Sequence, residues 1–338
     1  IDKESGMVLE QGVLEINKEN GTIKYQTNSG NKEEISIKDG NCKLQWKVDF
    51  GARWADFEVD FEIYGKDHLA NEKIYKKICS ILGGSPPVTF CYEMFLSEDG
   101  AKISKSSGNG IAVEDWLKYA PKESLALYMF QKPQTAKRLY FDVIPKAMDE
   151  YLSFLNSYHK PEVTLADKTT NPVFHIHFGK IPPQPNFNIS YSLLLNLASA
   201  CNPEHEDILW DFIYKYQNDL NKYNSPLLAD MTKCAINYYN DFIKPHKEYY
   251  SPNEAETKAI LDLKTALLDK EALDAQDLQS IIFNIGKNHG YENKTMKNWF
   301  SLLYQTLLGQ KQGPRMGSFI KIYGATNFIS LINKLIKN

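Results

Sequence analysis

The sequence lacks the features that mark membrane proteins, secreted proteins and zinc proteins. No uninterrupted apolar run approaches the roughly 20 residues that span a bilayer, and the first residues lack a basic-then-apolar signal layout. The five cysteines form no C-x-x-C pair, which indicates neither a disulfide framework nor a metal site. We therefore expect a cytoplasmic protein with no metal, whose scattered thiols are free and mostly buried: Cys42, Cys79, Cys91, Cys201 and Cys234.

Arginine is also scarce, since only Arg53, Arg138 and Arg315 occur. The net charge of −3 argues against a protein that coats nucleic acid over its whole surface. Positive charge can still be concentrated locally, and an ordinary solvated helical face is an equally good interpretation of the candidate strip Lys118, Lys122, Lys132, Lys137, Arg138 and Lys146. At 338 residues and 43% apolar content, the chain has room for two or three globular domains.

The first half of the chain predicts strands and then an α/β pattern. Within residues 8–40, strand-like runs near Val13, Thr22 and Glu34 flank turns such as Asn20-Gly21, which is a strong hairpin signal. Further on, Val59–Tyr64 and Val88–Met94 read as strands, with a helix near Asn71–Leu82 between them. Ligands of open α/β sheets bind beyond the carboxyl ends of the strands, so we expect a site there.

After Glu114 the periodicity becomes helical. Apolar stripes predict a helical bundle, with one helix that ends at Gly286 and another that ends at Gly309. The clearest break is the proline-rich segment 182–185. His175 and His177 lie in a strand-like segment without nearby carboxylates, so we predict a structural or stacking role for them.

The most informative stretch is the Ser/Gly-rich segment 101–110, which carries two lysines three residues apart, Lys102 and Lys105. Two ammonium groups on such a loop suit a departing pyrophosphate, because cations and backbone N–H groups stabilise charge as it develops. The alternative is a solvated turn, since surface loops have the same composition.

The surrounding motifs resemble the class I lysyl-tRNA synthetases. They are K-L-x-W-x-V-D from Lys43, R-W at Arg53, G-K-D-H from Gly65, Y-E at Tyr92 and K-I-S-K-S from Lys102, with Ile103 in place of the usual methionine. Segments 179–183 and 307–319 also look like that family. The resemblance implies the second half of a Rossmann fold and then a helical bundle, divided as 1–42 (tail of a β-rich insertion), 43–130 (catalytic), 131–189 (helical connector) and 190–338 (anticodon binding).

The resemblance also implies the chemistry and its substrates: ATP with accompanying Mg²⁺, L-lysine and tRNA(Lys), with no membrane partner. Lys102 and Lys105 would neutralise the triphosphate, with Ser104 and Ser106 as auxiliary donors. Gly65 and Asp67 would join Lys105 in binding ATP. In the helical region Arg315 would bind tRNA, although it could instead cap a helix.

Trp46, His68 and Tyr92 occupy the family's lysine-pocket positions, all near strand ends. Aromatic faces desolvate the methylenes and attract the cation. Trp54 is a rival for Trp46, with core packing as its alternative. The carboxylate that meets the ammonium stays open among Glu62, Asp67 and Glu93.

The family's H-x-G-H element is absent, and only 101 residues precede Lys102. We therefore expect a carboxy-terminal portion of such an enzyme, or a chain numbered from inside it, which is inactive alone. A glutamyl-type synthetase and a truncated, non-catalytic tRNA-binding relative are the alternatives. The glutamyl type would place an arginine in the loop that here reads Gly65-Lys66-Asp67-His68.

Overall fold

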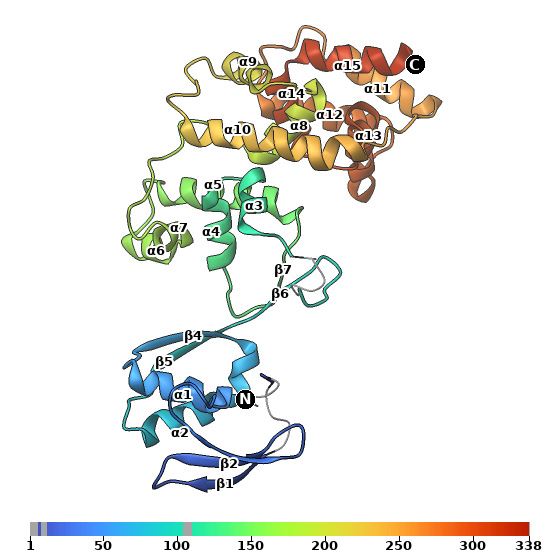
Figure 1. The fold of residues 1–338 in the computed structure, drawn as a ribbon. Coiled ribbons are helices and arrows are strands. Elements are labelled where there is room, and N and C mark those ends of the chain that lie inside the picture. Colours follow the sequence, from blue (N-terminus) through green and yellow to red (C-terminus); the bar gives the residue numbers. More distant parts are fainter. Residues whose placement is uncertain (1–5, 8–11, 104–109, 338) are drawn as a thin grey trace. The chain divides into compact units, whose positions relative to one another are not determined.

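The computed structural model describes residues 6–7, 12–103 and 110–337, without the side chains of 336–337. It divides into two compact units, Ile1–Met94 and Phe95–Asn338, each of which is described by itself. Figure 1 shows strands and helices in the first unit and mostly helices in the second. No helix among the described residues is both long enough and apolar enough to cross a membrane.

The first unit begins with a three-stranded antiparallel sheet. Its strands β1 (Val13–Asn17), β2 (Thr22–Gln26) and β3 (Lys32–Ser36) lie in chain order. Gly21 has a φ of 62° in the turn between β1 and β2, a left-handed conformation that costs glycine little. Tyr25 and Ile35 are buried in this sheet. The predicted hairpin is confirmed.

The rest of the first unit is a small α/β element. Helix α1 (Trp46–Asp56) precedes β4 (Phe61–Gly65), and the 3₁₀ helix η1 (Lys66–Asn71) leads into α2 (Glu72–Ile81) and then β5 (Val88–Tyr92). Strands β4 and β5 are parallel, and Gly65 lies opposite Tyr92 at their carboxyl ends. Both predicted strands and the helix between them are confirmed. Helix α1 was not predicted.

The two faces of the β4–β5 pair differ because side chains alternate along a strand. On one face Tyr64 packs with Trp54, Tyr75 and Cys79 of the helices. On the other face Phe61 and Ile63 of β4 and Val88 of β5 are all more than half exposed. The sheet is therefore covered on one side by α1 and α2.

The second unit is almost entirely helical, as the periodicity predicts. Two short parallel strands, β6 (Phe95–Leu96) and β7 (Lys137–Arg138), pair near its start. Its helices are α3 (Val113–Tyr119), α4 (Lys122–Phe130), α5 (Val143–Tyr158), α6 (Leu165–Thr170), α7 (Pro172–Ile176), α8 (Tyr191–Cys201), α9 (Glu206–Tyr216), α10 (Pro226–Tyr238), the π-helix η3 (Tyr239–Ile243), the 3₁₀ helices η4 (Lys244–His246) and η5 (Asn293–Thr295), α11 (Glu254–Ala266), α12 (Ala275–Asn288), α13 (Met296–Leu308), α14 (Met316–Tyr323) and α15 (Ala325–Lys337).

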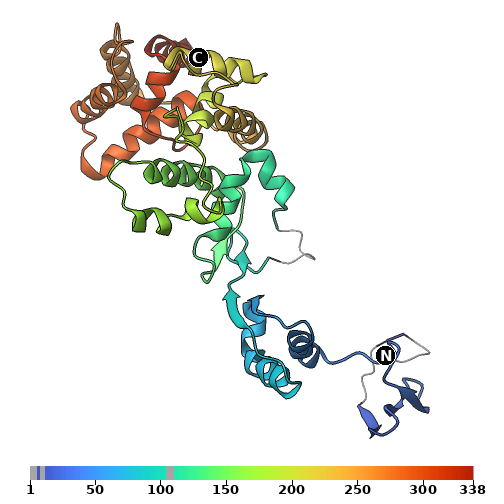
Figure 2. The same ribbon diagram turned by 90° about the vertical axis from the view of Figure 1, so that its left-hand side faces the viewer.

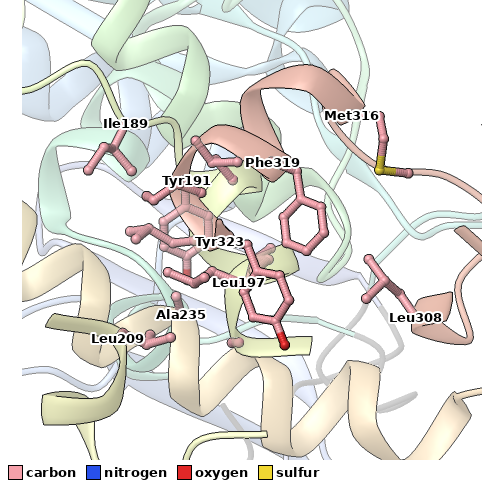
Figure 3. Packing of buried hydrophobic residues seen from close by; sticks show 14 of the residues in the cluster. Ile189, Tyr191, Leu197, Leu209, Ala235, Leu308, Met316, Phe319 and Tyr323 are labelled. Carbon is pink, nitrogen blue, oxygen red and sulfur yellow. The ribbon is translucent and has the colours of Figure 1, made fainter. Parts of the chain in front are cut away.

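One continuous hydrophobic core joins the helices of the second unit, and Figure 2 shows them packed from the green α5 to the red α15. In Figure 3, Tyr191 and Leu197 of α8 lie among side chains of α9, α10 and α14. The Tyr191 hydroxyl donates a hydrogen bond to the carbonyl of Tyr119, which ties α8 to the end of α3.

Two local predictions in this unit are wrong. Gly286 does not end its helix, because α12 continues to Asn288; its backbone lies against the Trp299 ring, where an added Cβ would come within 2.5 Å. His175 and His177 do not lie on a strand, because Asn171 caps helix α7 and Pro172 begins it.

The roles proposed for the two histidines are confirmed. The ring of His175 stacks on Phe130 at 5.2 Å, and His177 Nε2 shares a hydrogen bond with the Tyr151 hydroxyl at 3.0 Å. The predicted end of α13 at Gly309 is also confirmed, with a φ of 69°. All five cysteines are free, but only Cys79 and Cys234 are buried. The four-part domain division stays a prediction.

The candidate basic strip contains side chains with different environments. Lys118 pairs with Asp241, with its Nζ 2.6 Å from the carboxylate. Lys137 is half-buried and donates to the carbonyls of Tyr128 and Gln131, and burial lowers the pKa of its ammonium group. Lys137 therefore packs under the surface and does not belong to a solvated face.

Candidate functional site

The three predicted lysine-pocket residues all lie in the first unit, and two of them, Trp46 and His68, meet in an aromatic cluster. The Trp46 ring meets the edge of His68, with ring centres 5.3 Å apart and planes at 87°. Trp46 is 45% exposed and begins helix α1, and its ring contacts His68 near the carboxyl end of β4. His68 lies on η1, directly beyond the carboxyl end of β4, as predicted.

The cluster continues inward through two residues that sequence reasoning missed. Phe50 packs between His68 and Tyr75, with ring centres 4.9 and 4.8 Å away. Tyr75 is fully buried on α2, and its hydroxyl is 3.3 Å from His68 Nδ1. Phe50 follows Trp46 by four residues, one turn along the same face of α1, and this spacing was the available signal.

Trp54, the rival of Trp46, belongs to the core. It is 1% exposed, and its indole N–H donates to Glu62 Oε2 at 3.1 Å. Trp54 is therefore unavailable as a pocket wall, and its indole N–H donates to one of the two oxygens of the Glu62 carboxylate.

Tyr92 ends β5 and lies over Gly65, the last residue of β4. An added Cβ at Gly65 would be 3.5 Å from the Tyr92 ring, so glycine leaves the ring close to the backbone. Lys66 Nζ pairs with Glu93 Oε2 at 2.7 Å beside them. That hydrogen bond lowers the pKa of the Glu93 carboxyl and raises the pKa of the Lys66 ammonium group.

A second carboxylate, that of Glu72, connects helix α2 to the sheet. Glu72 accepts a hydrogen bond from Thr89 of β5 at 2.6 Å and forms an ion pair with Lys76 one turn along α2. The hydrogen bond from Lys76, followed by that from Thr89, lowers the pKa of Glu72 to about 2. Glu72 thus fixes the start of α2 to β5.

The lysine loop belongs to the second unit, and residues 104–109 lie outside the described residues. Ser104, Lys105 and Ser106 are therefore not placed. The segment leading into the loop is a turn in which Ser97 donates to Asp99 at 2.5 Å, and Lys102 then bridges to Leu96 in antiparallel fashion. Hydrogen bonds from Ser97 and from the Ala101 N–H lower the pKa of the Asp99 carboxyl.

Arg315, the predicted tRNA contact, is exposed and immediately precedes α14. Its carbonyl accepts from the Phe319 N–H at 3.1 Å, whereas its side chain makes no capping hydrogen bond. The Tyr304 hydroxyl donates to the carbonyl of Pro314 and holds the preceding loop. Arg315 is thus an exposed residue on a backbone that hydrogen bonds hold at the start of α14.

Comparison with known proteins is decisive for the family. The family model described as tRNA synthetases class I (K) matches residues 1–180. The chain belongs to the class I (K) tRNA synthetases.

Curated relatives of this synthetase family include the lysine–tRNA ligases of Rickettsia peacockii (strain Rustic) and Rickettsia africae (strain ESF-5), each 50% identical over 329 residues. Each alignment covers 97% of this chain, which spans 62% of the length of those relatives. Among solved structures, a glutamate tRNA ligase from Elizabethkingia meningosepticum matches with a TM-score of 0.29 and 12% identity, over 94% of this chain and 66% of that one.

Among the described residues of this synthetase chain, no group of three or more His, Cys, Asp and Glu side chains is placed to hold a metal ion. The structure thus brings together Trp46 with His68, and Tyr92 with Gly65. It adds Phe50 and Tyr75 to the cluster. Asp67 is exposed on η1, next to His68.

Proposed function

We propose that this chain is part of a lysine–tRNA ligase, which activates L-lysine with ATP in the cytoplasm and transfers the lysyl group to tRNA(Lys). The observation that carries the proposal is the 50% identity to lysine–tRNA ligases across 97% of the chain. The aromatic cluster of Trp46, Phe50 and His68 supports it independently.

The lysine pocket would use the exposed side of that cluster together with Tyr92. A lysine side chain needs apolar contact for four methylenes and an electron-rich face for its ammonium group, and aromatic rings supply both. Trp46 is 45% exposed and Tyr92 is 43% exposed, so each has free ring surface to offer. Trp54 is buried and is left out of the pocket.

Activation would rest on positioning and charge. The lysine carboxylate attacks the α-phosphorus, and Lys102 and Lys105 stabilise the charge on the departing pyrophosphate. Ser104 and Ser106 would add hydrogen-bond donors, and Gly65 and Asp67 would contact the nucleotide. Mg²⁺ would arrive with the ATP phosphates, where it neutralises charge, and no residue of this chain is assigned to it.

The test is lysine-dependent ATP–pyrophosphate exchange by the full-length protein and its Lys105→Ala variant. We expect exchange to fall by orders of magnitude while lysine affinity is kept, because the ammonium group acts on the leaving group alone. Lys160→Ala, at another exposed lysine, is the matched control and should exchange normally. Unchanged exchange in Lys105→Ala, or an equal loss of lysine affinity, would refute the assignment.

A separate prediction concerns tRNA. Arg315→Ala should weaken tRNA charging but leave pyrophosphate exchange nearly intact, because exchange needs no tRNA. Arg315→Lys keeps the charge but loses the planar fork, so it should recover only part of the charging rate. A lower melting temperature with normal tRNA affinity would instead assign Arg315 to the structure of the α14 start.

A further inference from the structure

A short hairpin of residues 95–103 leads into the lysine loop and carries Lys102. Strand β6 forms its first arm, and residues 101–103 form its second arm, with Lys102 opposite Leu96. On its other side β6 pairs with β7 (Figure 1), and the Leu139 N–H donates to the Leu96 carbonyl at 2.7 Å. Because β6 is held by β7, the position of Lys102 depends on how the second arm pairs with β6.

The backbone pairing between the two arms is weak within the described residues. The Ser97 N–H donates to the Ala101 carbonyl at 2.8 Å, which is an ordinary hydrogen-bond length. The next bond, from the Ile103 N–H to the Phe95 carbonyl, is 3.5 Å long. That length lies beyond the roughly 2.7–3.2 Å typical of such bonds. The register of the second arm therefore depends on the turn between the arms.

Asp99 closes that turn with its side chain. Its Oδ1 accepts from the Ser97 hydroxyl at 2.5 Å and from the Ala101 N–H at 3.1 Å. The two donors belong to the first and last residues of the turn, so one carboxylate oxygen ties both ends together. Gly100 has a φ of 88° between them, which costs glycine little. Ala101 is thereby held opposite Ser97, directly before Lys102.

The register decides on which face of the hairpin Lys102 lies. Leu96 and Lys102 form a non-hydrogen-bonded antiparallel pair, because the two backbone bonds flank them, and such side chains share one face. A slip of one residue would move every side chain of the second arm to the opposite face. Stabilisation of charge depends on the position of the cation, and a misplacement of about 1 Å can cost roughly a hundredfold in rate.

We propose that Asp99 is a positioning residue, which ties Ser97 to Ala101 and so fixes the register that places Lys102 for pyrophosphate departure. The inference rests on the proposed function, in which Lys102 stabilises the charge on the pyrophosphate. In this role Asp99 acts through Lys102. The turn uses Oδ1 as an acceptor only, and an amide oxygen accepts in the same way, so the role requires an oxygen and not a negative charge.

Lysine-dependent ATP–pyrophosphate exchange by the full-length protein tests this role. Asp99→Ala should lower kcat roughly ten- to a hundredfold, while the KM for lysine stays within about twofold. Asp99→Asn keeps the acceptor oxygen and should retain most of the wild-type kcat. Glu98→Ala removes the exposed neighbouring carboxylate and should behave as wild type. Equal losses in Asp99→Asn and Asp99→Ala would overturn the role, because the charge would then be the essential property.

A double variant shows whether Asp99 acts through Lys102. In Lys102→Ala the ammonium group is already absent, so the addition of Asp99→Ala should lower kcat by no more than about threefold. A merely structural role would not produce this non-additivity. A further loss as large as that of Asp99→Ala alone would mean that Asp99 acts independently of Lys102, and the inference would be wrong.

The register is measured independently of catalysis by NMR of the full-length protein. The Cα atoms of a non-hydrogen-bonded antiparallel pair lie about 4.5 Å apart, so the Hα atoms of Leu96 and Lys102 should give a strong cross-strand NOE. We expect it to persist in Asp99→Asn and to weaken at least about twofold in Asp99→Ala. An undiminished NOE in Asp99→Ala would overturn the inference. Failure of the proposed function differs, because the wild type would then show no lysine-dependent exchange while the NOE result would still stand.

Discussion

A single carboxylate, that of Glu72, links α2 to β5. Its pKa of about 2 lies below the ordinary value of 4.5, chiefly because Lys76 and Thr89 hydrogen-bond the charged form. A depressed pKa in the folded state means that the stabilisation is fully present above about pH 4.5 and is lost as the pH falls towards 2. The Glu72 side chain is 22% exposed, so solvent screening is only partial.

We predict that Glu72→Gln destabilises the first unit by about 1–2 kcal/mol at pH 7 and removes most of its pH dependence between about pH 4.5 and 2. Urea unfolding followed by hydrogen exchange of β4, α2 and β5 amides measures this. Asp60→Asn, at an exposed acidic residue of the same unit, is the control and should keep the wild-type pH profile. If Glu72→Gln kept the wild-type pH profile, the interactions of Glu72 with Lys76 and Thr89 would contribute nothing to the stability of the first unit.

The sequence predicted some site residues and missed others for a physical reason. Motif resemblance marks residues such as Trp46, His68 and Tyr92 one at a time. Tyr75 becomes a partner of His68 only through the turn of η1 and the packing of α2, and a residue list does not encode that contact. The choice between Trp46 and Trp54 was open for the same reason, and burial of Trp54 decides it.

At the scale of elements, α1 and α2 approach closely because Gly51 has no side chain. An added Cβ there would be 2.7 Å from the Tyr75 carbonyl oxygen and 2.8 Å from Ile78 Cβ. We predict that Gly51→Ala destabilises the first unit by roughly 1–3 kcal/mol, although alanine is the better helix former. Gly12→Ala, where nothing lies within 4 Å, should change little. Denaturant unfolding gives both values, and a stabilised Gly51→Ala would mean that the helices separate without cost.

Asp149 joins two helices of the second unit. Its carboxylate accepts from the Tyr191 N–H at 2.5 Å, from the Ser192 N–H at 3.2 Å and from the Ser192 hydroxyl, at the start of α8. We predict that Asp149→Ala costs about 1–3 kcal/mol of unfolding free energy, because it leaves buried N–H donors unpaired. Glu150→Ala changes the exposed neighbour and should be nearly neutral. Equal effects of the two variants would refute a specific role for the Asp149 carboxylate.

The element predictions succeeded where a pattern extended over many residues. The strands, the helix between β4 and β5 and the long helical stripes all appear in the structure. The errors concern patterns of only a few residues. The three residues from His175 to His177 are too few to distinguish a strand from a helix. The segment is helical because Asn171 caps α7 and Pro172 begins it. Gly286 was predicted to end its helix, but its lack of a side chain instead leaves space for the Trp299 ring.

At the scale of the whole molecule, the two units have unequal cores. In the described α/β part of the first unit, the buried cluster comprises Trp54, Tyr64, Tyr75 and Cys79. In the second unit one cluster draws on helices from α3 to α15. The free energy of unfolding grows with the apolar area that a unit buries, and the first unit also leaves Phe61, Ile63 and Val88 exposed.

We therefore predict that the 338-residue chain unfolds in two steps and that the first unit opens at the lower urea concentration. Hydrogen exchange followed by mass spectrometry should show peptides from residues 46–92 losing protection while those from α5, α8 and α13 keep it. Trp54→Phe should reduce the early part of the fluorescence change, to which Trp46 of the same unit also contributes, whereas Trp299 in the second core should report only the late step. An apolar dye should bind the chain at low urea, because the exposed face of β4 and β5 offers a surface for it. A single transition in which all peptides lose protection together would mean that the two units are energetically one, and the division of the chain at Met94 would then have no thermodynamic meaning.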